Sequence, residues 1–224
     1  MTQSQKTQDF STTNVDKTTA FIEKNKKILG GVIAGLVVVA LGIYCYINYY
    51  QAPREEKASY LLARGENYFA AGNYDMALNG DKAEFNGFLS IAQKYSGTKA
   101  ANLAKLYAGL CDAQLVDAQN AIKYIEDFST KSDQLVSPAS IAALGNCYAK
   151  TGNIDKAISL LKKAAEKADN NSLSPIFYIQ AGELLESQGK KDEALKLYQI
   201  VKSKYALSAE AATIDKYIER ASAH

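Results

Sequence analysis

Residues that could carry out chemistry are few in this chain. The only histidine is His224, the last residue, so no Ser-His or Cys-His pair and no histidine metal cluster can be built. No glycine-rich phosphate loop of the Walker or G-x-G-x-x-G kind occurs. Paired acids, such as Glu126 with Asp127, lie beside basic residues at expected helix ends, where solvated charges are common. The sequence predicts no enzyme activity, no metal and no cofactor.

The three cysteines do not form a disulfide framework. Cys45 lies in an apolar run, while Cys111 and Cys147 lie in expected helices at equivalent small-residue positions. We interpret Cys111 and Cys147 as packing residues. Free thiols of this kind are compatible with any cellular compartment.

Charge balance weighs against nucleic acid as a partner. Residues 51–224 carry 21 basic and 21 acidic residues, and the net charge of the whole chain is +2. Nucleic-acid binding rests on phosphates neutralised by a basic domain or stripe, which a neutral domain lacks. We expect protein partners, with no nucleic acid and no small-molecule substrate.

Composition favours helices throughout. Only three prolines and no tryptophan occur, and 47% of the residues are hydrophobic. Ala, Leu, Lys and Glu are abundant, and these residues are good helix formers. The predicted fold class is all-α.

An uncharged run divides the chain at residues 28–50. As a helix it would be roughly 34 Å long, enough to cross a bilayer core of about 30 Å. We predict three segments: a largely disordered cytoplasmic tail over 1–27, a transmembrane signal-anchor helix over 28–50, and a single large domain over 51–224. The chain would then be a single-pass membrane protein.

Two other interpretations of the run fit less well. A cleaved signal peptide has a shorter apolar region and a small-residue cleavage site, whereas here 27 residues precede the run. A lipoprotein needs a small residue before its lipidated cysteine, but Tyr44 precedes Cys45. Lys24, Lys26 and Lys27 crowd the N-terminal end, which places that end in the cytoplasm by the positive-inside rule.

Small residues mark one face of the run. Gly31 and Gly35 form a G-x-x-x-G pattern, which can dock against a second transmembrane helix. Small residues are also common in membrane helices generally. Both interpretations stay open at this point.

The remainder of the chain repeats with a period near 36 residues. Gly109, Gly145 and Gly182 recur at spacings of 36 and 37, and each is followed 12 residues later by alanine. A further unit over 60–78 contains Gly65, but Gly65 lies 44 residues before Gly109, the glycine of the next unit. Asn79, Gly80 and Asp81 occupy the excess, so we expect a broken or lengthened second helix there, with Asp81 capping a new one.

These units resemble tetratricopeptide repeats, which are helix pairs with an apolar residue, a glycine, an aromatic residue, a turn glycine and an alanine at fixed offsets. The resemblance implies a right-handed α-solenoid of about four helix pairs. In the second unit Asp112 stands where the aromatic residue is expected and Val116 where the turn glycine is expected. Residues 209–221 read as a C-terminal helix that caps the stack.

A solenoid of this kind presents a concave surface built from the first helix of each pair. Registering the units on their glycines predicts the partner-binding residues of that surface. They are Glu66, Phe69, Leu106, Leu110, Gln114, Asn146, Lys150, Ile179, Glu183 and Glu186. This mixture suits an extended polypeptide or a partner helix. Glu183 and Glu186 would repel a terminal carboxylate, which disfavours the clamp by which some such domains hold chaperone tails.

The order of tail, anchor and repeats resembles the ancillary subunit family of the bacterial Sec translocon. The stretch "GTKAANLAKLYAGLC" over 97–111 is similar to bacteroidete-type members. The resemblance implies a single-pass protein of the bacterial inner membrane whose repeat domain, residues 51–224, lies in the periplasm. It also implies a non-enzymatic adaptor or chaperone cofactor whose partners are the translocon channel, a membrane-anchored peptidyl-prolyl isomerase or unfolded clients. Two alternatives remain: an import-type receptor with cytoplasmic repeats, and an envelope scaffold for cell division or secretion.

Overall fold

The computed structural model describes the backbone of residues 3–81 and 83–223, and side chains over 23–81 and 83–223. It divides into two compact units, Met1–Pro53 and Arg54–His224. All regular elements in the described part are helices, so the predicted all-α class is confirmed.

Every described residue of the first unit, 3–53, is helical. Helix α1 (Gln3–Cys45) passes into a π-helical segment, η1 (Tyr46–Gln51), and then into α2 (Ala52–Ala70). A helix from Gln3 differs from the disorder that the composition of residues 1–27 predicts. No glycine or proline precedes Gly30, so no residue there interrupts the helical backbone.

Apolar side chains of α1 are exposed over the uncharged run. Glu23–Ala70 is the one described helical stretch long and apolar enough to cross a membrane, and its most apolar part is not buried at all. Leu36 and Val38 expose 64% and 68% of their surface. Large apolar patches on a soluble surface are unfavourable, which makes this helix a candidate membrane anchor.

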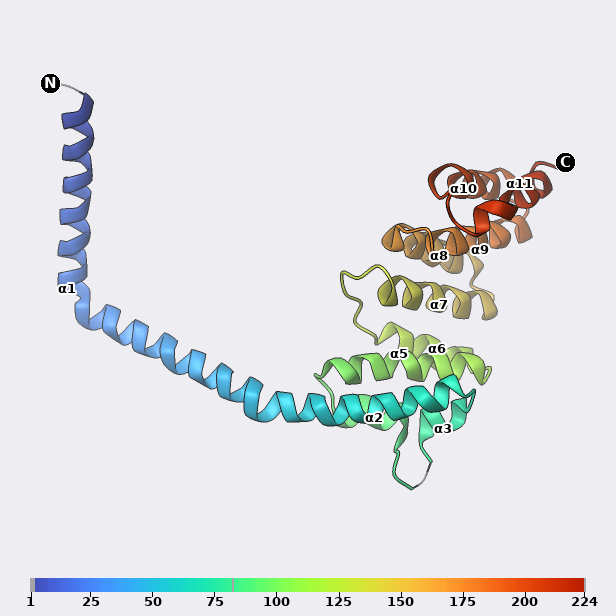
Figure 1. The fold of residues 1–224 in the computed structure, drawn as a ribbon, viewed down its shortest axis with the longest axis horizontal. Coiled ribbons are helices and arrows are strands. Elements are labelled where there is room, and N and C mark those ends of the chain that lie inside the picture. Colours follow the sequence, from blue (N-terminus) through green and yellow to red (C-terminus); the bar gives the residue numbers. More distant parts are fainter. Residues whose placement is uncertain (1–2, 82, 224) are drawn as a thin grey trace. The chain divides into compact units, whose positions relative to one another are not determined.

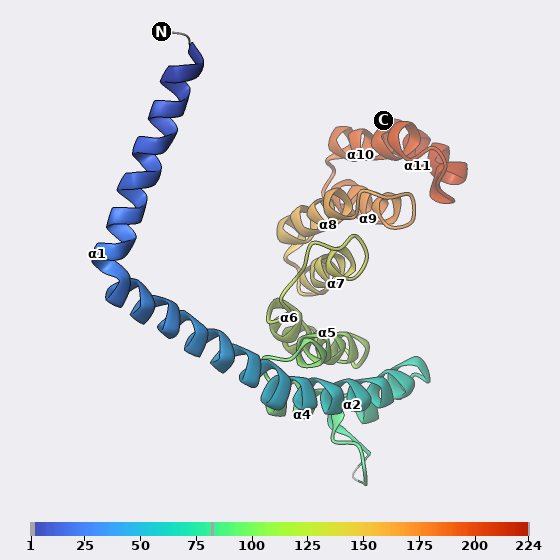
Figure 2. The ribbon, with the colours of Figure 1, turned by 60° about the vertical axis from the view of Figure 1, so that its left-hand side comes forward.

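The second unit is a stack of antiparallel helix pairs (Figures 1 and 2). After α2 come α3 (Tyr74–Asn79), α4 (Gly87–Lys94), α5 (Lys99–Gln114), α6 (Ala118–Glu126), α7 (Val136–Lys150), α8 (Ile154–Ala168), α9 (Ser174–Ser187), α10 (Lys191–Lys204), the 3₁₀ turn η2 (Glu210–Thr213) and α11 (Ile214–Ser222). From α3 to α11, each α-helix packs against the next in chain order. The predicted C-terminal helix is present as α11.

Small residues set the distance between the helices of a pair. A Cβ atom on Gly109 would lie 2.9 Å from the carbonyl oxygen of Ala121, and one on Gly145 would lie 3.2 Å from that of Ala157. A larger residue at either position would require the two helices to move apart. The recurring glycines therefore mark the close approach of the two helices in these two repeats.

The second helix of the first repeat is broken, as expected. Its two parts, α3 and α4, are joined by a loop in which Gly80 and Gly87 have φ values of 98° and 80°. Asp81 does not cap α4, which differs from the prediction. Its Oδ1 instead accepts hydrogen bonds from the backbone N–H groups of Ala83, Glu84 and Phe85, at 2.9 to 3.0 Å, and so closes a turn ahead of the helix.

Val116 occupies the turn position that glycine fills in the other repeats. Its φ is 66°, close to the 76° to 82° of Gly72, Gly152 and Gly189, and its side chain is 85% exposed. Left-handed backbone is unfavourable for a β-branched residue by about 1–2 kcal/mol. The turn therefore keeps its geometry despite the wrong residue type.

Replacing Val116 with glycine should raise the free energy of unfolding by about 1 kcal/mol, because the strain disappears and little side-chain contact is lost. Urea denaturation of the full chain in detergent micelles measures this change. The reverse exchange, Gly152→Val, supplies the matched control and should destabilise. A Val116→Gly protein no more stable than the wild type would contradict the prediction.

Asp112 is a carboxylic acid in the core. It is 6% exposed, and its Oδ2 has no hydrogen-bond partner among the described residues. Burial, with the charge of Asp117 as a smaller cause, raises the pKa of Asp112 to about 6. Folding thus disfavours the carboxylate form of Asp112 relative to the unfolded chain.

This raised pKa predicts a pH signature that Asp112→Asn should remove. Because the pKa of Asp112 is higher in the folded protein than in the unfolded chain, protonated Asp112 stabilises the fold fully at pH values below its ordinary pKa. This stabilisation is lost as pH rises through about 6. Between pH 8 and pH 4, wild type should gain roughly 2 kcal/mol relative to Asp112→Asn. Urea titrations of both proteins across this range measure the difference, and a constant difference would contradict the prediction.

Candidate protein-binding surface

Two of the predicted groove residues lie in the core, and a third packs against it. Leu106 and Ile179 are only 6% and 8% exposed. Phe69 is half-buried, and its ring packs edge-on against Tyr74 and Tyr107 at centroid distances of 5.3 and 5.4 Å. We therefore assign these three residues to packing and not to partner contact.

The Glu186 side chain is already hydrogen-bonded within the protein. Arg220 of α11 donates two hydrogen bonds to its carboxylate, each at 2.8 Å, and the Tyr198 hydroxyl donates a third. Arg220 and Tyr198 lower the pKa of Glu186, because both stabilise the charged form. This carboxylate holds the capping helix against the fourth repeat, a role that registering on glycines did not reveal.

The remaining predicted residues reach the surface to different extents. Gln114, Asn146, Lys150 and Glu183 are exposed, whereas Glu66 and Leu110 are half-buried. They come from four successive first helices, α2, α5, α7 and α9. Lys150 donates from Nζ to the carbonyl oxygen of Ala113 at 3.2 Å and so links two of these helices. The surface they form is polar and of mixed charge.

Gly31 and Gly35 lie on an open face of α1. A Cβ atom on either would meet no atom within 4 Å. No atom lies against the G-x-x-x-G face at these two positions, so a second helix could approach it. Its role in docking stays a prediction.

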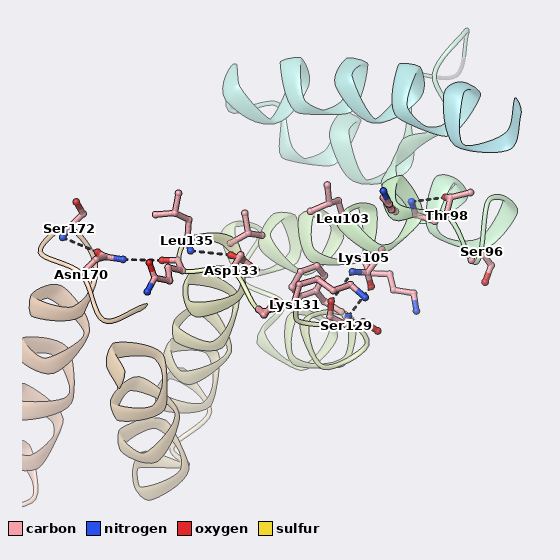
Figure 3. Close-up of a pocket in the computed structure, with 18 residues that line it drawn as sticks. Ser96, Thr98, Leu103, Lys105, Ser129, Lys131, Asp133, Leu135, Asn170 and Ser172 are labelled. Atoms are coloured by element: carbon pink, nitrogen blue, oxygen red, sulfur yellow. Dashed lines mark hydrogen bonds between the residues drawn. The ribbon is translucent and has the colours of Figure 1, made fainter. Parts of the chain in front are cut away.

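A large cleft lies elsewhere on the repeat unit, and sequence reasoning missed it. We call it the loop cleft: a volume of about 1370 Å³ bounded by the first half of α5 and by residues 96–98, 128–136, 170 and 172. Figure 3 shows its lining residues in a row, with Asn170 and Ser172 at one end and Ser96 at the other. The cleft is therefore elongated and crosses three repeats.

Asparagine side chains lock the walls of the loop cleft. Asn102 accepts from the backbone N–H of Ser129 at 2.8 Å and donates to its carbonyl oxygen at 3.0 Å. Asn170 donates to the carbonyl oxygen of Gln134 at 3.0 Å. Each asparagine side chain ties the long loop between α6 and α7 to a neighbouring repeat.

Asp133 stabilises the same loop from within. It accepts hydrogen bonds from the Ser137 hydroxyl and from the backbone N–H groups of Leu135 and Ser137, the last two at 3.0 Å. These donors, the Ser137 hydroxyl foremost, lower the pKa of Asp133 to about 2. The carboxylate therefore stays charged and is directed into its own loop.

The inner surface of the loop cleft is mainly apolar and its edge is basic. Leu135 and Val136 expose 62% and 43% of their surface, and Leu103 is half-buried. Lys99 and Lys131 are exposed at the edge, and Lys105 forms an ion pair with Asp127 at 3.7 Å. In the sequence, the one pointer to this site was the apolar pair Leu135-Val136 after six polar residues.

No arrangement for catalysis emerges from this geometry. Over residues 23–81 and 83–223, whose side chains are described, no group of three His, Cys, Asp or Glu side chains is placed to hold a metal ion. Burial raises the pKa of the Cys111 thiol to about 12, so this sulfur is a poor nucleophile. What the surface offers is room and charge for another polypeptide.

A family model described as a tetratricopeptide repeat-like domain matches residues 20–216. The chain belongs to this tetratricopeptide repeat-like family. The match begins ahead of the apolar run, so the candidate anchor and the repeats both lie within the family's domain. Membership indicates a non-catalytic protein-interaction adaptor, and the expected repeat architecture is confirmed.

Similar proteins were found among curated sequences and solved structures. A relative from Aggregatibacter actinomycetemcomitans, named ancillary SecYEG translocon subunit, is 26% identical over 162 residues, 72% of this chain and 76% of the relative. The repeats of a putative kinesin light chain from Podosopora anserina align with a TM-score of 0.60 and 13% identity, over 75% of this chain and 86% of theirs. MamA protein aligns with a TM-score of 0.54 and 17% identity, over 74% and 90%. The two structures establish the fold alone.

Proposed function

We propose that this family member is a membrane-tethered adaptor of the Sec translocon. Its N-terminus lies in the cytoplasm, α1 spans the inner membrane, and the repeat unit lies in the periplasm. The partners are the translocon channel together with a membrane-anchored peptidyl-prolyl isomerase or unfolded clients emerging from the channel. The relative named as an ancillary translocon subunit supports this proposal.

The observation that carries the proposal is the exposed apolar surface of α1 within the same family match as the repeats. Side chains of this kind need lipid around them, and the charge-free stretch is long enough to span it. A tether raises the effective concentration of the repeat unit near a membrane partner. Weak contacts on the repeat surface would then suffice.

Co-purification tests the link to the translocon. The full chain is extracted from membranes in a mild detergent and the channel subunits are measured in the eluate. We expect the channel to be retained. Loss of the channel at wild-type expression would overturn the translocon assignment and leave the envelope scaffold as the better interpretation.

The glycine face of α1 can be tested in the same experiment. Gly31→Leu with Gly35→Leu should reduce channel recovery, because close approach of two helices requires small residues. Ile33→Leu with Val37→Leu on the same helix is the matched control and should leave recovery unchanged. Equal recovery from both double variants would reduce α1 to a tether.

Orientation is tested by thiol labelling in spheroplasts. Cys111 and Cys147 are buried with raised pKa values, so a membrane-impermeant maleimide should leave them unmodified. An added cysteine at Ser159, which is exposed on α8, should be labelled from outside if the repeats are periplasmic. A cysteine at Ser4 should not be labelled until the cells are lysed. The opposite pattern would favour the import-type receptor.

A further inference from the structure

We infer that the loop cleft is a docking site for a polypeptide segment in which apolar side chains are flanked by acidic ones. The inference rests on the proposed adaptor function and names the chemistry of a partner. The proposed binding site is therefore not the predicted concave surface but the edge of the stack, where the loops between repeats meet.

Size and shape favour a polypeptide over a small molecule. Pockets for small ligands are typically about 300–1,000 Å³, and the loop cleft measures about 1370 Å³. Its lining residues extend in a row across three repeats (Figure 3). An extended segment can follow such a row, with alternate side chains turned toward the cleft.

Apolar side chains at the surface provide the contacts. Leu135 is 62% exposed and Val136 43%, although both are large and hydrophobic. Leu103 lines the same cleft, so apolar side chains are available at more than one place along it. Covering these side chains with leucine-like side chains of a partner removes apolar surface from water on both sides.

Charge selects among apolar segments. Lys99, Lys105 and Lys131 all line the cleft, and among the described residues Asp133 is the one carboxylate that lines it. Asp133 accepts three hydrogen bonds from Leu135 and Ser137, so its oxygens are already engaged within the protein. Lys105 is shared with Asp127, whereas Lys99 and Lys131 form no ion pair among the described residues. Acidic side chains on the partner complement this edge.

Hydrogen bonds already hold the walls of the site together. The Asn102–Ser129 pair of hydrogen bonds and the Asn170–Gln134 bond hold the long loop at two points. A preformed wall lowers the entropic cost of ordering a loop on association.

The test uses the full chain in nanodiscs of phosphatidylcholine and a fluorescent peptide of about twelve residues in which Asp and Leu alternate. Fluorescence anisotropy measures binding, with empty nanodiscs as the baseline. We expect saturable binding to the wild type that weakens as salt is added. Lys99→Glu with Lys131→Glu should weaken it by about tenfold or more. A peptide with Lys in place of Asp should prefer that double variant.

Two further variants separate the cleft from general attraction. Lys57→Glu with Lys196→Glu makes the same change of charge at exposed positions that do not line the cleft, and should leave binding nearly unchanged. Leu135→Ser with Val136→Ser keeps the charge and should weaken binding by about tenfold. Equal losses from the two lysine pairs, or full binding by the serine variant, would overturn the inference.

Failure of this inference and failure of the proposed function give different results. A protein that binds the Asp-Leu peptide in the expected way but recovers no channel keeps the cleft and loses the translocon assignment. A protein that recovers the channel but does not bind the peptide loses the cleft alone. Binding by anionic vesicles that depends on Lys99 and Lys131, without peptide binding, would assign the edge to lipid and overturn the inference.

Discussion

Gly87→Ala is expected to lower the free energy of unfolding by about 3 kcal/mol or more, since it combines backbone strain with a steric clash. Gly87 has a φ of 80°, and a Cβ atom there would lie 2.3 Å from the carbonyl oxygen of Leu78. The other close atoms belong to the backbone of Asn79 and Gly80. Backbone cannot rotate away as a side chain can, so α3 and α4 would have to separate.

Gly152→Ala is the matched control for this prediction. Gly152 has nearly the same φ, 82°, but its added Cβ would meet no atom within 4 Å. It should cost about 1 kcal/mol, the strain of left-handed backbone alone. The difference between the two variants isolates the close approach of α3 and α4. Urea denaturation followed by circular dichroism measures both, and equal losses would show that the loop accommodates the methyl group.

A break in the helix at Gly80 was predictable because the residues there have strong conformational preferences. Asn79, Gly80 and Asp81 favour turns for separate physical reasons, and the extra length between repeat glycines had to be placed somewhere. The position of Asp81 within the turn was not predictable. Its oxygen accepts from three consecutive N–H groups, a geometry that depends on backbone the sequence pattern does not specify.

The helix pairs followed from periodicity, but the exposure of individual residues did not. Leu106 and Ile179 occupy equivalent positions three residues before their repeat glycines. In both repeats the side chain is buried among the surrounding helices. Aligning the repeats on their glycines indicates which face of a helix a residue occupies. The burial of that residue also depends on how closely the next repeat packs against it.

The loop cleft lay beyond sequence reasoning for a related reason. Its walls come from loops near residues 97, 131 and 171, which belong to three different repeats. Hydrophobic periodicity describes the faces of helices and carries no information on the path of a loop. Side-chain hydrogen bonds of Asn102 and Asn170 join these segments, and the sequence pattern does not reveal those bonds.

The C-terminal cap provides the second large prediction. Arg220→Ala is expected to lower the free energy of unfolding by about 2–3 kcal/mol, because it leaves the Glu186 carboxylate with a single hydrogen-bond donor. The Glu186 side chain is only 14% exposed, so water can replace the guanidinium poorly. The same change should loosen α11, which hydrogen exchange of its amide groups would detect as reduced protection.

Lys202→Ala tests whether loss of any ion pair to α11 lowers the free energy of unfolding as much as loss of the Glu186–Arg220 pair does. Lys202 binds Asp215 of α11 at 2.7 Å, but the two side chains are 58% and 67% exposed. Exposed pairs contribute about 0–1 kcal/mol, so this variant should unfold almost as the wild type does. Ion pairs of Arg220 with Glu186 and Glu183, and of Lys202 with Asp215, thus join α11 to the preceding repeat. The predicted difference in free energy comes from the burial of Glu186. Equal effects of the two substitutions would contradict the assignment of Glu186 to the cap and return it to the partner-binding surface.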